Sequence, residues 1–141
     1  MMDAMSSSWK KEIIRAPSDR APATRTPASA HAVRVGPLVF VTGQSGRQPG
    51  GADNYSDDPA EQARQTMENI KAILEEAGTS LEHAIKRTVI VGHPSMLPKI
   101  RPVLESYFTS PVASTTLQGC LMREEKVLEV EVIALVPEPA P

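Results

Sequence analysis

Cysteine, aromatic residues and metal-binding motifs are scarce in this sequence. Its single cysteine, Cys120, cannot form a disulfide within one chain, and no cluster of Cys and His with the spacing of a zinc site occurs. We therefore expect no zinc site, which fits a reducing compartment. The first residues hold no apolar signal region, so we expect the cytoplasm by default. Cys120 lies in an apolar neighbourhood with no adjacent base, so we expect a buried, inert thiol.

Long runs of one kind of residue are also missing. Fifteen basic residues against seventeen acidic ones give a net charge of −2, and no basic run or aromatic-interleaved basic patch is present. This composition predicts no nucleic-acid partner. No stretch approaches the roughly 18 apolar residues of a membrane span, so we expect no membrane partner either. A small molecule is the favoured partner.

The chain has the size of one domain. With 141 residues, of which 40% are hydrophobic, it can bury a core of its own. We expect a single domain over 9–136, a disordered tail at 1–8 and a C-terminal tail at 137–141. Residues 15–30, rich in Pro, Ala, Ser and Thr, predict an extended surface segment outside the core.

The order of elements predicted for the domain is β-β-α-β-α-β-β. Pro102 falls inside the second helical region, where we expect a kink or a late start. The last two strands are predicted to form a hairpin across MREEK. The expected elements are strands 31–35 and 38–43, a helix from 59 to 77, strand 86–91, a helical region at 95–108, strands 114–121 and 127–136, and an optional first strand at 9–15.

The first helix has the clearest signals. Asp57 or Asp58 can cap it, Pro59 suits its first turn and Gly78 ends it. Apolar residues recur at spacings of four and three, which predicts one stripe that packs on a core. The residues of this stripe are Ala63, Met67, Ile70, Leu74 and Ala77.

The last strand, LEVEVIALV, has two different faces. Because side chains alternate along a strand, Leu128, Val130 and Val132 share a wholly apolar face. The other face carries Glu129 and Glu131 among apolar residues. An unpaired buried carboxylate is costly, and an apolar face in water is unfavourable, so this face suits partial cover by another subunit.

Several segments in the same order resemble the RidA family, also called the YjgF family of reactive-intermediate deaminases. They are VRVGPLVFVTGQ, EQARQTMENIKAILEEAGTSLEHAIKRTVIV, and YFTSPVASTT followed by LEVEVIALV. The resemblance implies a chorismate-mutase-like α+β fold with a mixed sheet and two helices on one face. It also implies a homotrimer with a central barrel, pockets at subunit clefts, and cofactor-free hydrolysis of enamines or imines to keto acids and ammonia.

The resemblance assigns roles to particular positions. It places the family's acidic residue, which holds or activates the attacking water, on Glu131, the catalytic candidate. Its Ser-Gly pair, whose backbone approaches the ligand, corresponds to Thr42 and Gly43. Ser114 and Thr115 are candidates to place hydroxyls in the same cleft.

Three positions depart from the family pattern. Ala113 stands where the family has its carboxylate-binding arginine, Ser29 replaces a tyrosine, and Arg101 replaces an asparagine. Without the guanidinium fork at 113, the substrate is expected to differ from the usual amino-acid-derived imines. Arg101 is the first candidate for a replacement anchor; His31, Arg34 and Arg47 are weaker ones.

Two other classes of function stay open. One is a different hydrolytic, tautomerase or decarboxylase step on a catabolic intermediate in the same cleft. The other is a ligand-binding or regulatory trimer without turnover, because a fold does not by itself determine activity.

Overall fold

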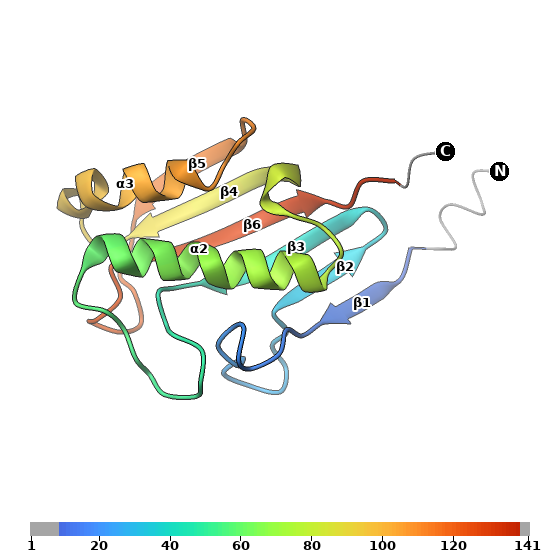
Figure 1. Cartoon of the computed structure of the whole chain (residues 1–141), viewed down its shortest axis with the longest axis horizontal. Coiled ribbons are helices and arrows are strands. Elements are labelled where there is room, and N and C mark those ends of the chain that lie inside the picture. Colours follow the sequence, from blue (N-terminus) through green and yellow to red (C-terminus); the bar gives the residue numbers. More distant parts are fainter. Residues whose placement is uncertain (1–8, 139–141) are drawn as a thin grey trace.

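The computed structural model describes residues 9–138, so the predicted tail at 1–8 and residues 139–141 lie outside it. One six-stranded mixed sheet carries two α-helices on one face (Figure 1). The elements are β1 (Lys11–Ile14), β2 (Ala32–Val35), β3 (Leu38–Gln44), α2 (Pro59–Glu76), η1 (Leu81–His83), β4 (Ala84–Val91), η2 (Pro94–Met96), α3 (Leu97–Ser106), β5 (Ala113–Gln118) and β6 (Leu128–Leu135). The predicted order of elements and the α+β class are confirmed.

The predicted hairpin between the last two strands is wrong. The strand order is β1-β2-β3-β6-β4-β5, with β6 antiparallel to both β3 and β4, and β5 parallel to β4 at the edge. The chain reaches β5 from β4 through α3 and then returns to the centre of the sheet. The physical reason lies in burial: β6 buries alternate residues, whereas all six residues of β5 are exposed, as suits an edge strand.

Helix α2 begins and ends where its sequence signals indicate. The Asp58 carboxylate accepts a hydrogen bond of 3.1 Å from the backbone N–H of Ala60, and Pro59 is the first helical residue. At the other end Gly78 adopts a left-handed φ of 88°, and its N–H donates to the Glu75 carbonyl. All five residues of the predicted apolar stripe are buried.

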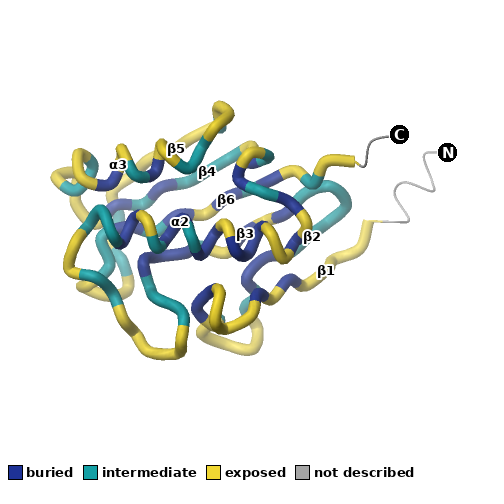
Figure 2. The backbone as a smooth tube through the Cα atoms, viewed as in Figure 1, coloured by how far each residue is buried: buried dark blue, intermediate teal, exposed yellow. Residues whose placement is uncertain are grey.

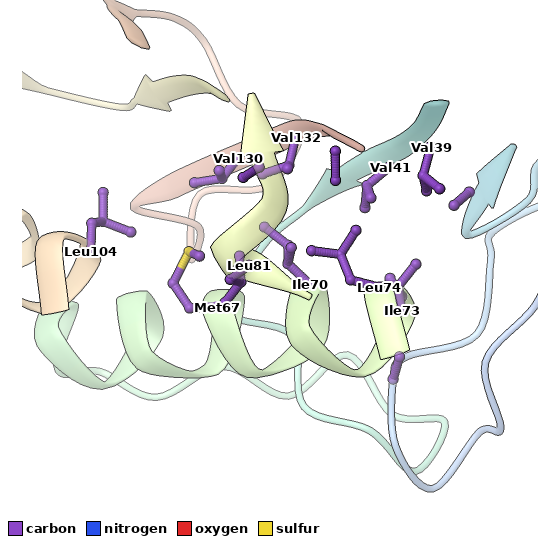
Figure 3. Packing of buried hydrophobic residues seen from close by; sticks show 14 of the residues in the cluster. Val39, Val41, Met67, Ile70, Ile73, Leu74, Leu81, Leu104, Val130 and Val132 are labelled. Atoms are coloured by element: carbon purple, nitrogen blue, oxygen red, sulfur yellow. The ribbon is translucent and has the colours of Figure 1, made fainter. Parts of the chain in front are cut away.

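The core lies between this stripe and the helix-facing side of the sheet. Met67, Ile70 and Leu74 point from α2 toward the sheet, where Val41, Val130 and Val132 lie (Figure 3). Burying each such side chain contributes roughly 1.5–3 kcal/mol. Two alanines of segment 15–30, Ala16 and Ala21, also belong to the core, so the prediction that this segment lies wholly on the surface is wrong at these positions.

Helix α3 runs through Pro102 instead of starting after it. It buries Ile100 and Leu104 and packs beside α2. The Tyr107 hydroxyl at its end donates a hydrogen bond of 2.7 Å to Glu68 on α2. Burial first, and then this hydrogen bond, raise the pKa of Tyr107 to about 12. Among residues 9–138, no helix is long and apolar enough to cross a membrane.

The face of the sheet that no helix covers, called the open face below, is partly apolar. In the chain's burial map the central strands and the inner side of α2 are buried, while β1 and many loops are exposed (Figure 2). Ile13, Phe40, Leu117 and Leu135 are each at least 40% exposed. The strand register puts Ile13, Phe40 and Ile133 in one cross-strand row on the open face. The two-faced character predicted for β6 is therefore present in the fold.

Candidate functional site

A small polar pocket lies at the end of β3, where three segments meet. Its volume is about 140 Å³, and it is lined by residues from 22–31, 42–47 and 126–129. A water molecule in the liquid takes roughly 30 Å³, so the space suits a metabolite of a few carbon atoms. We call this cavity the β3 pocket.

A β-bulge shapes the floor of the β3 pocket. The register between β3 and β6 shifts between Val41 and Gln44, so Thr42 and Gly43 leave the regular ladder. The Thr42 hydroxyl donates a hydrogen bond of 2.6 Å to the Ala30 carbonyl, which ties the bulge to segment 22–31. Gly43 has no side chain, and a β-carbon there would lie 3.3 Å from the carboxyl carbon of Glu129. The bulge therefore brings the β3 backbone against a carboxylate.

The carboxylate in the β3 pocket is Glu129. It extends from β6 and lies 3.5 Å from the Lys126 ammonium. Glu131, the residue to which the resemblance assigned the catalytic role, lines a different depression on the open face, with Phe40, Lys86 and Thr88. Glu131 is exposed, whereas Glu129 is partly buried. The structure thus brings Glu129, and not Glu131, together with Thr42 and Gly43.

Ser29 and His31 also line the β3 pocket. Both ring nitrogens of the buried His31 have partners: Nδ1 accepts a 2.8 Å hydrogen bond from the Ala16 N–H, and Nε2 lies 2.7 Å from the Pro22 carbonyl. Because Nδ1 accepts, Nε2 carries the proton and donates. His31 therefore holds the first turn of segment 15–30 against the sheet and is already fully bonded.

The remaining site candidates lie away from the β3 pocket. Ala113, Ser114 and Thr115 are on the edge strand β5, which β4 and β6 separate from β3. The Ser114 and Thr115 hydroxyls accept hydrogen bonds from Arg87 and Lys86, at 2.9 and 3.0 Å. Exposed Arg101 lies on α3 and does not line the pocket. Arg34 donates to the Gly36 and Ala77 carbonyls, also outside the pocket.

Arginines gather at the mouth of the β3 pocket. Arg25 and Arg47 line it, and both pair with Asp53 from loop 48–58, at 2.7 and 3.8 Å. Arg123 pairs with the same carboxylate. A hydrogen bond from Arg25 holds the pKa of the Asp53 carboxyl below its ordinary value. Burial, followed by the nearby Arg25, lowers the pKa of the Arg47 guanidinium.

Buried polar residues of α2 hold the pocket segments in place, and the sequence patterns did not single them out. Asn69 donates to the Ser45 and Arg47 carbonyls at 3.1 and 2.8 Å. Gln62 donates to the Ser56 and Glu125 carbonyls at 2.8 and 2.6 Å, and accepts from the Val127 N–H. Gln62 and Asn69 are seven residues apart, so they share one side of the helix.

The expectation for the cysteine is wrong. Cys120 is exposed, which corrects the prediction of a buried thiol, because β5 ends at Gln118 and the cysteine falls in the following turn. Within residues 9–138, no group of three His, Cys, Asp or Glu side chains is arranged to hold a metal ion.

The chain is similar to known proteins over most of its length. A family model described as Endoribonuclease L-PSP matches residues 18–136. A RutC family protein of Pyrococcus abyssi is 35% identical over 125 residues, which cover 88% of this chain and 96% of that protein. The 2-iminobutanoate/2-iminopropanoate deaminase of Salmonella typhimurium is 31% identical over 122 residues, which cover 84% and 94%. The crystal structure of Escherichia coli TdcF with bound serine gives a TM-score of 0.80 at 30% identity, covering 89% and 98%.

The fold and pocket define an α+β protein with a mixed sheet, two helices on one face and a small polar cavity at the end of a strand. The matches cover nearly the whole chain and also show its family. The chain belongs to the RidA or YjgF family, as its sequence segments indicated.

Proposed function

We propose that this protein hydrolyses an imine or enamine metabolite to a carbonyl compound and ammonia in the β3 pocket, without a cofactor. The observation that carries the proposal is the approach of Glu129 to the bulge at Thr42 and Gly43 inside a cavity of about 140 Å³. Relatives about 30% identical, from Salmonella typhimurium and Bos taurus, carry the name of a 2-iminobutanoate/2-iminopropanoate deaminase. A net charge of −2 does not favour an RNA substrate.

The proposed reaction needs one group that moves protons. The Glu129 carboxylate takes a proton from a water molecule as the water oxygen attacks the C=N carbon. That proton passes from Glu129 to the imine nitrogen, which gives a neutral carbinolamine. Glu129 then takes the hydroxyl proton of the carbinolamine and passes it to the amine nitrogen, so that the C–N bond breaks, the C=O bond forms and ammonia leaves. The Lys126 ammonium lies 3.5 Å from the Glu129 carboxylate and puts a positive charge beside the group that moves the protons.

We further propose that the working form is a cytoplasmic homotrimer. Ala113, Ser114 and Thr115 are separated from the β3 pocket by two strands, so within one chain they do not reach it. A neighbouring copy can bring its exposed edge strand β5 to that pocket, and cover the apolar residues of the open face. In such an assembly both groups of site candidates meet in one inter-subunit cleft.

Ammonia release from freshly generated imines tests the proposed reaction. Purified protein should accelerate ammonia and keto-acid formation from 2-iminobutanoate or a related imine, in proportion to protein concentration and beyond the spontaneous rate. A product without ammonia would instead favour the tautomerase or decarboxylase alternative. Stabilisation by ligands with no product from any imine would favour a binding or regulatory protein.

A further inference from the structure

The mouth of the β3 pocket carries an excess of positive charge. Four cationic side chains, Arg25, Arg47, Arg123 and Lys126, face two carboxylates, Asp53 and Glu129. Three of these cations, Arg25, Arg47 and Arg123, pair with the same carboxylate, that of Asp53. An excess of this kind beside a concave site favours an anionic ligand.

Arg47 is the cation best placed to contact such a ligand. Its side chain is only 12% exposed, and it lines the β3 pocket. Its Nη2 donates to the Ala23 carbonyl, and the Arg47 carbonyl accepts from Asn69, so both ends of the residue are held. Its separation of 3.8 Å from Asp53 is longer than a charge-assisted hydrogen bond of about 2.7–2.9 Å. Asp53 therefore leaves part of the hydrogen-bonding capacity of the Arg47 guanidinium unused.

The edge strand β5 offers no comparable cation at position 113. Ala113 has no polar side chain, and Lys86 donates to Thr115. Arg87 pairs with Glu105 on α3 and does not line the β3 pocket. Arg101 remains on α3, outside the pocket. Among the described residues that line the β3 pocket, the partly buried arginine is Arg47, from the segment after β3.

We propose that Arg47, assisted by Arg25, binds the carboxylate of an anionic imine substrate in the β3 pocket, and that Asp53 weakens this binding by competing for the same guanidinium groups. The inference rests on the proposed function, because it takes the β3 pocket as the substrate site. It places the substrate among small imino acids, which revises the expectation drawn from Ala113 that the substrate differs from amino-acid-derived imines. The carboxylate of this substrate points toward loop 48–58. Its C=N carbon then lies toward Glu129.

Binding of the product-like anion 2-oxobutanoate tests the anchor without requiring turnover. Its dissociation constant is measured from the ligand-dependent shift in melting temperature, with neutral 2-butanone as the matched compound that lacks a carboxylate. We expect 2-oxobutanoate alone to stabilise the natural protein. Arg47→Gln should weaken its binding by about tenfold or more, the usual effect of losing a charge-assisted hydrogen bond.

Two further variants protect the test from a folding defect. Asp53→Asn leaves all three arginines in place and removes their shared carboxylate, so it should tighten 2-oxobutanoate binding. Arg64→Gln, which removes a surface arginine that pairs with Glu61 on α2, should leave binding unchanged. The opposite signs of the Arg47 and Asp53 variants cannot arise from a general loss of stability.

The outcomes separate this inference from the proposed function. Equal binding of 2-oxobutanoate by natural protein and Arg47→Gln, weaker binding by Asp53→Asn, or no binding at all would overturn the anchor. Ammonia release together with unchanged binding in Arg47→Gln would overturn the anchor alone. Binding that depends on Arg47, without ammonia release from any imine, would support the anchor and overturn the deaminase proposal.

Discussion

Glu129→Gln will lower kcat/KM for imine hydrolysis by about 100-fold or more, whereas Glu131→Gln will leave it within about twofold of the natural protein. Glutamine keeps the size of the side chain but cannot accept a proton from the attacking water. Glu129 lies in the β3 pocket beside Gly43, while Glu131 lines a separate depression with Lys86 and Thr88. The two variants remove the same charge from positions two residues apart on one strand.

This pair of variants decides which of the two carboxylates, Glu129 or Glu131, takes part in the reaction. The resemblance assigned the acidic role to Glu131, and the structure places Glu129 where that role can be carried out. Size-exclusion chromatography of both variants serves as the control for assembly. Loss of activity in Glu131→Gln with full activity in Glu129→Gln would restore the original assignment and remove the β3 pocket from the mechanism.

Gly46→Ala will destabilise the protein by about 3 kcal/mol and impair the β3 pocket. A β-carbon at position 46 would lie 2.8 Å from the Cα and Cβ atoms of Gln62 and 2.9 Å from its carbonyl oxygen. These atoms belong to the backbone region of α2, which cannot move aside as a flexible side chain does. Overpacking of this kind typically costs about 1–3 kcal/mol, occasionally more. Urea unfolding measures the change in free energy.

Gly92→Ala is the matched control for that substitution. A β-carbon at position 92 would lie 3.7 Å from the Lys126 carbonyl, an ordinary contact distance. We expect a change in the free energy of unfolding below about 1 kcal/mol. Similar stability of the two alanine variants would show that segment 45–47 is not held tightly against α2.

The sequence predicted the elements better than their pairing. Spacing and capping signals identified α2 together with its buried stripe, because a long amphipathic helix is specified locally. The partner of β5 is not specified locally. Strands 114–121 and 127–136 are close in sequence, which favoured a hairpin, but β6 is apolar enough on its inner face to need two neighbours in the centre of the sheet.

The candidate site was predicted only in part, for two physical reasons. Thr42, Gly43, Ser29 and His31 do meet in one pocket, because the adjoining strands were recognised correctly. The choice between Glu129 and Glu131 depends on the bulge in β3, and alternation along β6 cannot resolve it because both carboxylates occupy the same face.

The buried polar residues of α2 that hold the pocket segments were indicated only weakly by the sequence. Gln62, Thr66 and Asn69 repeat at spacings of four and three beside the apolar stripe, which indicates a buried polar side of α2. The partners of Gln62 and Asn69, in segments 45–47, 56 and 125–127, are distant in sequence. The arginines around Asp53 are likewise gathered from three separate segments, and no local pattern joins them.

A crystal structure of the protein with bound 2-oxobutanoate tests the central claim most directly. We expect the keto acid to lie in the β3 pocket, with its carbonyl carbon beside Glu129 and its carboxylate bound to Arg47. A ligand bound instead in the depression lined by Glu131 and Lys86 would contradict the site proposed for the reaction.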